Sequence, residues 1–237
     1  MFAGQRAIVT GGTSGIGKAI AAALTAAGCD MTATGLTPAE VEPLARSNPM
    51  SAVVLDVTDQ AAIDRLVGRF DRLDILVNCA GMILRGGAEF QMHNFQRVLD
   101  VNLAGTMRMC LACRPLLALQ GGSIVNMASM LSFFGSPVAP AYSASKGAIS
   151  QLTRSLAIAW AADKIRVNAV APGWIETALT RPLVEDAALS ERIVGRTPLG
   201  RWGTPDDVAG AVVFLSSPAA AFITGTVLPV DGGYSAA

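Results

Sequence analysis

Short runs of apolar residues alternate along the chain with longer segments whose apolar residues recur at helical spacing. Runs of the first kind are typical of strands buried on both faces, and the segments between them are typical of helices that cover a parallel sheet. The pattern predicts strands at 7–9, 31–34, 52–55, 75–78, 123–127, 166–170 and 226–229, and helices at 15–27, 38–45, 59–70, 95–119, 141–162 and 206–215. The expected fold class is α/β, with one doubly wound parallel sheet of about seven strands and helices on both faces.

The length of the chain, 237 residues, accommodates one large domain of this class and little more. No internal repeat, low-complexity tract or linker interrupts the pattern, so we expect a single domain over 1–237. The least regular stretch is 174–202, which precedes the last predicted helix. A long irregular segment in a compact domain is often a lid over an active site, and we predict that role for it.

Composition narrows the range of functions. Apolar residues make up 51% of the chain and charged residues 15%, and 18 basic residues balance 18 acidic ones. This balance argues against a nucleic-acid or anionic-membrane partner. Segment 208–230 is uncharged and long enough to span a membrane, but its serines, Pro218 and Gly225 favour a buried helix, a turn and a strand. The N-terminus lacks the regions of a signal peptide, so we expect a cytoplasmic protein without membrane spans.

The four cysteines are too few and too scattered for a disulfide framework. Cys110 and Cys113 form a C-x-x-C pair, a spacing that redox and metal sites also use. The pair lies in a predicted helix, no second pair follows it, and His93 is the sole histidine. We therefore predict two small apolar side chains on a helix face and no metal site.

The first predicted strand runs into a glycine-rich turn, Thr10-Gly11-Gly12-Thr13-Ser14-Gly15-Ile16-Gly17. Glycines let a backbone turn tightly and approach a pyrophosphate, and the following helix offers free N–H groups and the positive end of its dipole. The G-x-x-x-G-x-G spacing differs from the commoner G-x-G-x-x-G fingerprint, and a turn that only packs helix against strand would look similar. The position after the first strand favours a dinucleotide site that uses Gly11, Thr13, Ser14, Gly15, Ile16 and Gly17.

Tyr142 and Lys146 lie four residues apart in a predicted helix, which puts them on one face. Because a nearby ammonium group favours a phenolate, we expect Lys146 to lower the pKa of Tyr142 from its usual value near ~10. Such a tyrosine can donate or remove a proton at a carbonyl or an alcohol. By itself the spacing is also compatible with a solvated pair on an amphipathic helix.

Together, these motifs resemble those of the short-chain dehydrogenase/reductase family, whose members have a Rossmann fold. The resemblance rests on Thr10-Gly11-x-x-x-Gly15-Ile16-Gly17, Asn78-Cys79-Ala80-Gly81, Asn102, Ser129, Tyr142, Lys146 and Pro172-Gly173, in the expected order over about 2–234. Cys79 departs from the pattern, because many members carry a second asparagine there. A dinucleotide-binding regulator without turnover is the non-enzyme alternative; it could have lost Ser129, Tyr142 or Lys146, and this chain retains all three.

The resemblance implies a role for each matching residue. Tyr142 would be the general acid–base, and Lys146 would assist it and bind the nicotinamide ribose. Ser129 would orient the substrate oxygen, with Ser132 as a rival at a less typical spacing. Asn102 would hold a water for proton relay, and a buried amide satisfied by the backbone is the alternative. The cofactor-binding residues expected beyond the glycine-rich turn are Leu36, Asp56, Val57, Asn78, Ala80, Gly81, Tyr142, Lys146, Pro172, Gly173, Ile175 and Thr177.

The tip of the second predicted strand faces the adenine ribose and decides between NAD and NADP. Residues 34–37 are neither acidic nor basic, and Ser14 replaces the basic residue that often precedes Gly15 in phosphate-preferring members. Without a counter-charge for a 2′-phosphate we expect NAD, with NADP left open. The resemblance assigns Asp56 and Val57 to the adenine, and Ile175 and Thr177 to the nicotinamide carboxamide.

The expected reaction is a reversible NAD(P)-dependent interconversion of an alcohol and a carbonyl compound. Residues 80–85 are loosely similar to sugar-acid and polyol dehydrogenases of the family, and the overall pattern is also near 3-oxoacyl thioester (acyl-carrier-protein) reductases. A polyol, sugar acid or other small hydroxy compound is the expected substrate, and Arg85 could meet its carboxylate or stay solvated. Family habit implies a homodimer or homotetramer through the helices predicted at 95–119 and 141–162.

Overall fold

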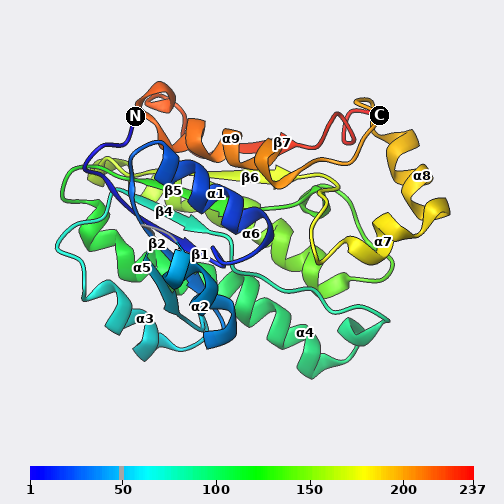
Figure 1. Ribbon diagram of the computed structural model, residues 1–237, viewed down its shortest axis with the longest axis horizontal. Helices are drawn as coiled ribbons and strands as arrows, with labels where there is room; N and C mark the ends of the chain where they lie inside the picture. The colour runs from blue at the N-terminus through cyan, green and yellow to red at the C-terminus, as the bar shows by residue number, and fades with distance from the viewer. Residues whose placement is uncertain (48–50) are drawn as a thin grey trace.

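A computed structural model describes residues 1–47 and 51–237. The described residues form one seven-stranded sheet in the order β3-β2-β1-β4-β5-β6-β7, with every neighbouring pair parallel (Figure 1). Its strands are β1 (Arg6–Thr10), β2 (Asp30–Gly35), β3 (Ser51–Val54), β4 (Ile75–Asn78), β5 (Ser123–Met127), β6 (Arg166–Pro172) and β7 (Val227–Val230). The predicted fold class is confirmed, and each strand lies within two residues of its predicted bounds.

Helices cover both faces of the sheet (Figure 1). The α-helices of the described residues are α1 (Gly15–Ala26), α2 (Pro38–Ser47), α3 (Gln60–Val67), α4 (Met92–Leu99), α5 (Gly105–Leu117), α6 (Pro140–Ala159), α7 (Arg181–Glu185), α8 (Ala187–Arg196) and α9 (Pro205–Ser216). Apolar side chains of α1, α2 and α9 share one core with one face of the central strands, and those of α3, α5 and α6 share another with the opposite face. Alternate strand residues enter the two cores, as Val9 and Ile8 do on β1.

Two predicted helices differ from the observed ones. The run predicted at 95–119 begins earlier, with α4, and passes through a π-helical segment, η2 (Asp100–Ala104), before α5. Helical periodicity does not distinguish a π-turn from an α-turn over so few residues, so the insertion could not be predicted. The helix predicted at 59–70 is the shorter α3. It begins after Asp59, whose side chain caps it by accepting a hydrogen bond from the N–H of Ala62, and it ends at Val67, before Gly68.

The segment predicted as irregular at 174–202 contains two helices, α7 and α8. Pro182 lies in the first turn of α7, where a missing N–H costs nothing. Asp186 caps α8, since its side chain accepts a hydrogen bond from the N–H of Leu189. These signals were present in the sequence, but both helices are short and largely exposed, so they lack the apolar periodicity on which the prediction relied.

The sheet reverses its strand order at β1, which lies between β2 and β4. Ligands of open α/β sheets bind at such a switch point, outside the carboxyl ends of the strands. Thr10 at the end of β1 is paired in register with Asn78 at the end of β4. The glycine-rich turn after β1 and the segment after β4 therefore leave the sheet side by side.

The cysteine pair and the uncharged segment fold as predicted. Cys110 and Cys113 are buried, free thiols in the core that α5 and α6 share, and burial raises their pKa values. Segment 208–230 forms most of α9, then the short helix η5 (Pro218–Ala220) and β7. Within 1–47 and 51–237, no helix has the length and apolar character needed to cross a bilayer, and no three His, Cys, Asp or Glu side chains gather as metal ligands.

Candidate active site

A cleft of about 620 Å³ opens beside the glycine-rich turn and the segment that follows β4. Its lining includes most residues predicted to bind the cofactor: Gly11, Thr13, Ser14, Gly15, Ile16, Gly17, Leu36, Asp56, Val57, Ala80, Gly81, Tyr142, Lys146 and Thr177. The predicted residues outside the described lining are Asn78, Asn102, Ser129, Pro172, Gly173 and Ile175. The structure thus brings the glycine-rich turn and the Tyr142–Lys146 pair, far apart in sequence, to one cleft.

The glycine-rich turn leaves room for a phosphate because side chains are excluded from it. Gly11 has φ +63°, and a Cβ there would lie 3.0 Å from backbone atoms of Ala80. A Cβ on Gly17 would lie 2.2 Å from the carbonyl oxygen of Gly11. In this part of the described chain, the Ser14 side chain does not cap α1 and the first turn carries no acidic residue. The first-turn N–H groups and the helix dipole therefore suit an anion such as a pyrophosphate.

Thr10, which the motif contains but the predicted site did not, fixes the wall of the cleft. Its hydroxyl oxygen accepts hydrogen bonds from the backbone N–H groups of Cys79 and Ala80, both at 3.1 Å. These bonds hold the segment after β4 against the end of β1. A hydroxyl residue at the last position of the first strand is the signal that could have identified this role.

Tyr142 and Lys146 share one face of α6, as the spacing predicted. The Lys146 Nζ lies 5.4 Å from the centroid of the Tyr142 ring and donates a hydrogen bond to the carbonyl oxygen of Met127 at 2.7 Å. Lys146 is only 4% exposed. Lys146 is therefore buried beside the half-buried Tyr142 and anchored to the end of β5, and the alternative of a solvated pair is wrong.

Ser129, rather than Ser132, reaches Tyr142. Ser129 acts on the Tyr142 phenol as a side-chain hydrogen-bond partner that lowers its pKa. The Ser132 hydroxyl donates to the carbonyl oxygen of Lys146 at 2.6 Å and accepts from the N–H of Ser129 at 3.3 Å. The Ser132 hydroxyl therefore fixes the turn after β5. The Ser129 oxygen also accepts from the N–H of Leu131 at 3.2 Å, and of the two serines Ser129 is the one that interacts with the phenol.

We expected Lys146 to lower the pKa of Tyr142, and this expectation is wrong: the pKa of Tyr142 is raised. Burial raises the pKa of Tyr142 to about 12; the hydrogen bond to Ser129 lowers it, and the charges of Cys79 and Glu89 raise it further. Burial also lowers the pKa of Lys146 to about 8, a change that Cys79 opposes. The prediction considered the ammonium charge alone, whereas desolvation of the buried phenolate is the larger effect.

Asn102 lies in η2 and is fully buried. Its side-chain oxygen accepts from the N–H of Met82 at 2.8 Å, and its amide donates to the Met82 carbonyl at 2.9 Å and to the Ser145 hydroxyl at 3.0 Å. The side chain thus joins the segment after β4 to α6. This geometry favours the alternative of a buried amide satisfied largely by backbone.

Asn78 lies beneath the cleft rather than in its lining. Its amide donates to the Asn126 side-chain oxygen at 2.9 Å and to the Cys110 sulfur at 3.2 Å, and its own side-chain oxygen has no hydrogen-bond partner among the described residues. Asn126 in turn donates to the Thr153 hydroxyl at 3.0 Å. This buried network fastens the ends of β4 and β5 to α5 and α6, so the Asn78 side chain supports the cleft from below and does not line it.

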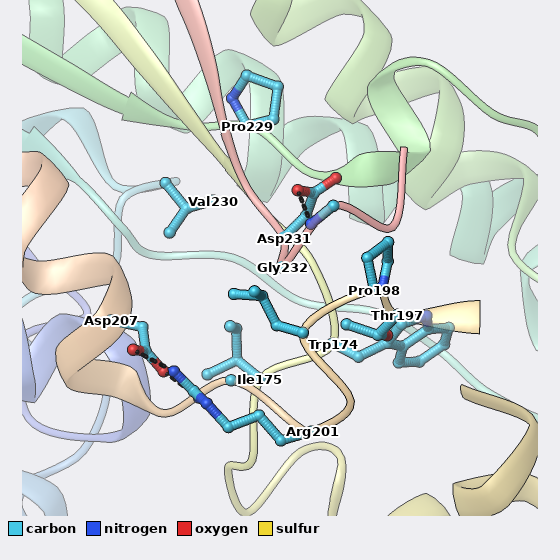
Figure 2. A pocket seen from close by; sticks show the side chains of 13 residues that line it. Trp174, Ile175, Thr197, Pro198, Arg201, Asp207, Pro229, Val230, Asp231 and Gly232 are labelled. Atoms are coloured by element: carbon cyan, nitrogen blue, oxygen red, sulfur yellow. Dashed lines mark hydrogen bonds and ion pairs between the residues drawn. The ribbon is translucent and has the colours of Figure 1, made fainter. Parts of the chain in front are cut away.

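Ile175 does not line the cleft to which the resemblance assigned it. Its side chain packs in the core beside α9. It also lines a second cavity of about 500 Å³, formed with Trp174, the 197–203 segment, the end of β7 and the residues that follow it (Figure 2). The Arg201–Asp207 ion pair lies at the edge of that cavity (Figure 2). Thr177, two residues later, does line the first cleft. The predicted nicotinamide contact is therefore supported for Thr177 and not for the Ile175 side chain.

Met82, Ala178 and Leu179 of the lining lie in segments 82–87 and 174–202, which we expected to form the walls of the substrate pocket. Other lining residues of the first cleft were not predicted: Gly35, Glu40, Leu55, Thr58, Cys79, Arg97, Asp100, Val101 and Met127. Most of them adjoin a strand end or a predicted site residue, so the positions alone could have suggested them. Glu40 and Arg97 project from helices, and no sequence motif marks them.

Comparisons with known proteins give full-length matches. The family model described as enoyl-(acyl carrier protein) reductase matches residues 11–235. The 2-dehydro-3-deoxy-D-gluconate 5-dehydrogenase of Bacillus subtilis (strain 168) is 44% identical over 240 residues, covering 98% of this chain and 94% of that protein. Its counterpart from Escherichia coli (strain K12) is 38% identical over 247 residues, covering 98% of this chain and 96% of that protein. A gluconate 5-dehydrogenase structure from Burkholderia cenocepacia J2315, in complex with NADP and tartrate, has a TM-score of 0.92 and 36% identity over 99% of this chain and 96% of that chain.

The doubly wound sheet and the cleft at its switch point define an α/β protein of the dinucleotide-binding class, with a tyrosine and a buried lysine lining the cleft. Given these full-length matches, the chain belongs to the short-chain dehydrogenase/reductase family. It is an NAD(P)-dependent oxidoreductase that acts on CH–OH groups, as the motifs predicted.

Proposed function

We propose that this oxidoreductase interconverts an alcohol and a carbonyl group on a sugar acid related to 2-dehydro-3-deoxy-D-gluconate or gluconate. The observation that carries the proposal is the Ser129–Tyr142–Lys146 group, with Lys146 buried, in a chain 44% identical over nearly its whole length to a sugar-acid dehydrogenase. A neutral polyol and a 3-oxoacyl thioester are the competing substrate classes, and the assay below distinguishes them.

The cleft residues divide the binding of the dinucleotide. The glycine-rich turn would hold the pyrophosphate, Asp56 and Val57 the adenine, Lys146 the nicotinamide ribose and Thr177 the carboxamide. When bound, the nicotinamide supplies hydride in the reducing direction and accepts it in the oxidising direction. The protein handles the proton and the orientation of the substrate.

Tyr142 donates its phenolic proton to the carbonyl oxygen during reduction and takes it back during oxidation. With a pKa of about 12, the phenol is protonated at neutral pH, so the donor form predominates. Ser129 orients the same oxygen and stabilises the developing alkoxide through its hydroxyl. Lys146, whose pKa is about 8, is mainly protonated at pH 7 and adds positive charge when the phenolate forms.

We further propose that NAD is preferred over NADP. Glu40 of α2 lines the cleft with Gly35 and Leu36, and its carboxylate accepts hydrogen bonds from the Leu36 N–H at 3.0 Å and the Thr37 hydroxyl at 3.2 Å. This puts a negative charge at the tip of β2, where acidic residues of Rossmann folds bind the adenine ribose. A carboxylate there repels a 2′-phosphate. The Burkholderia relative was crystallised with NADP, so the preference needs a direct test.

Replacing Glu40 by glutamine is expected to tighten NADP binding about tenfold and to change NAD binding by less than about threefold. The substitution removes a charge near the proposed 2′-phosphate position but keeps an acceptor for Leu36. Titration calorimetry with both dinucleotides measures the four dissociation constants.

Glu42→Gln is the matched control, because it removes the same charge two residues further along the same helix and outside the described cleft lining. Its expected effect on either dinucleotide is small. A wild-type protein that binds NADP more tightly than NAD contradicts the preference. Equal effects of the two substitutions contradict the role of Glu40.

Arg85 is the proposed contact for the substrate carboxylate. It is exposed in the segment after β4, and its guanidinium donates to the Leu179 carbonyl at 2.8 Å, which joins that segment to the one after β6. Replacing it by alanine is expected to lower kcat/KM for a sugar acid by about ten- to a hundredfold, because a charge-assisted hydrogen bond is lost. A neutral polyol of the same length should be affected less than about threefold.

Steady-state kinetics with 2-dehydro-3-deoxy-D-gluconate, D-gluconate, a six-carbon polyol and an acetoacetyl thioester test both points. The sugar acids should have the highest kcat/KM of the panel. A thioester or a polyol with higher kcat/KM assigns the enzyme to the competing class. An Arg85→Ala effect that is equal for charged and neutral substrates excludes a carboxylate contact.

We propose that the chain is a single domain over 1–237 in which 174–202, with α7 and α8, closes over the substrate. The Arg85–Leu179 bond, which joins this segment to the one after β4, supports the arrangement. We also propose a cytoplasmic homodimer or homotetramer in which the helical run 92–117 and α6 of two copies pack together. Leu111 and Ile158 on these elements are large exposed apolar side chains, which such a contact would cover. Sedimentation of the purified protein measures the oligomeric state.

A further inference from the structure

Glu89 is a buried carboxylate that the proposed proton transfer does not use. It lies in the short helix η1 (Ala88–Phe90), between the segment after β4 and α4, and its exposed fraction is 0%. A carboxylate is expensive to bury unless hydrogen bonds or an opposite charge stabilise it. Its surroundings should therefore reveal what holds it there.

Both oxygens of Glu89 accept hydrogen bonds from the backbone. One accepts from the N–H of Leu84 and the other from the N–H of Tyr142, each at 2.9 Å. Within the described residues, none of the ion pairs involves Glu89. Its charge is stabilised by peptide N–H groups, a pattern in which each bond is charge-assisted and short.

The bond to Tyr142 occurs at the N-terminus of α6, where the helix lacks a local cap. In the described chain the N-cap position is Ala139, which has no side-chain acceptor, and the first turn contains no acidic residue. Tyr142 is the third residue of this 20-residue helix, whose first N–H groups need acceptors and whose dipole favours a negative charge. Glu89 supplies both, from 53 residues away in the sequence.

The bond to Leu84 ties the same carboxylate to the segment after β4, part of which lines the cleft. Leu84 lies between Met82, which lines the cleft, and Arg85, the proposed substrate contact. One side chain therefore bridges the substrate-facing segment and the helix that carries the proposed acid–base tyrosine. A displacement of either element would break one of the two bonds.

We infer that Glu89 is a positioning residue, which caps α6 at Tyr142 and fixes the distance between that tyrosine and the substrate-binding segment at Leu84. The inference rests on the proposed function, because it gives Glu89 its importance through Tyr142. Glu89 touches neither substrate nor cofactor in this role. It acts through the backbone of two neighbours.

The charge of Glu89 has a second consequence for Tyr142. The titratable groups that face the phenol are Glu89 from η1, Cys79 from the end of β4 and Lys146 from α6 itself. Glu89 and Cys79 raise the pKa of Tyr142. Removing the Glu89 charge should therefore lower the pKa of the phenol, so the rise of the oxidation rate with pH should begin at a lower pH.

Glu89→Gln tests the inference, because it removes the charge and one of the two acceptors with little change in size. The expected results are a kcat at least about tenfold lower, a dissociation constant for NAD within about twofold of wild type, and a pH midpoint for oxidation lower by at least about half a unit. The chain has two tyrosines, so in a Tyr234→Phe background ¹³Cζ-tyrosine NMR reports the titration of Tyr142 alone. Its midpoint should fall in the same direction.

Asp71→Asn is the matched control. Asp71 precedes β4, is exposed and forms an ion pair with Arg6, so its replacement also removes one carboxylate charge. It should leave kcat and the pH midpoint unchanged. Glu89→Gln with unchanged kcat and unchanged pH midpoint overturns the inference. If the variant does not fold, hydrogen exchange of the wild-type protein decides: strongly protected Tyr142 and Leu84 amides support the two bonds, and amides that exchange as in a free peptide overturn them.

The test of Glu89 and the test of the proposed function can fail independently of each other. If Tyr142→Phe retains full turnover, the proposed site is wrong, whereas the NMR titration and amide exchange still report whether Glu89 holds Tyr142. If Tyr142→Phe is inactive and Glu89→Gln behaves as wild type in every measurement, the site stands and the role of Glu89 is wrong.

Discussion

Replacing Tyr142 by phenylalanine is expected to lower kcat in both directions by about a thousandfold, since the proposed proton donor and acceptor is lost. The ring would still fill its place in the cleft wall, so the dissociation constant for the dinucleotide should stay within about threefold of wild type. Stopped-flow single turnovers and a separate binding titration measure the two quantities. Loss of kcat without loss of binding is the signature of a group that acts in the chemical step.

Tyr234→Phe is the matched control, because Tyr234 is the other tyrosine of the chain. Its ring packs against Trp174, and its hydroxyl accepts a long hydrogen bond from Arg196 at 3.4 Å. The substitution keeps the ring and should change kcat by less than about threefold. A Tyr142→Phe enzyme with the wild-type kcat would remove the proton-transfer assignment, and a large loss of dinucleotide affinity would make Tyr142 a binding residue instead.

The sheet could be predicted from sequence because buried parallel strands leave a strong local pattern. The apolar runs around Ile8, Leu76 and Ile124 are short, and each enters a core on both faces of the sheet. The glycine-rich turn was also predictable, since backbone geometry at Gly11 and Gly17 excludes a side chain. In both cases a few neighbouring residues carry the signal: apolar residues that are buried in the strands, and glycines in the turn.

The parts that could not be predicted depend on contacts between distant segments. Glu89 is an ordinary acidic residue in the sequence, and only the fold brings it to the N-terminus of α6. The pKa of Tyr142 depends on how deeply the phenol is buried, which spacing along a helix does not reveal. Asn102 matched a family motif, but its side-chain oxygen accepts a hydrogen bond from the N–H of Met82. Asn102 lies in a π-helical turn, which the helical periodicity did not predict.

Lys146→Met is expected to have opposite effects on activity and stability. The kcat/KM should fall by about a hundredfold or more, because the charge that assists the phenolate and the proposed ribose contact are both lost. The folded protein should become more stable at pH 7 by about 1–2 kcal/mol. Burial lowers the pKa of Lys146 from 10.5 to about 8, which corresponds to a cost on the order of 3 kcal/mol for the buried ammonium, while loss of the bond to Met127 offsets about 1 kcal/mol of the gain.

The pH dependence gives this stability prediction its sharpest form. Between pH 8 and 10.5 the unfolded chain still binds the Lys146 proton while the folded chain has released it, so this group makes the wild type more stable as pH rises through that window. The advantage of Lys146→Met should therefore be full below pH 8 and shrink above it. Denaturant unfolding at pH 7 and pH 9.5 measures this change. The pH stays below 10, because above it the titration of Tyr142 changes the free energy of unfolding with the opposite sign.

Lys18→Met, at an exposed position on α1, is the control and should show no such change. A Lys146→Met protein that is less stable than wild type at pH 7 means that the bond to Met127 outweighs the burial of the charge, and that the lysine is retained for the fold as well as for the reaction.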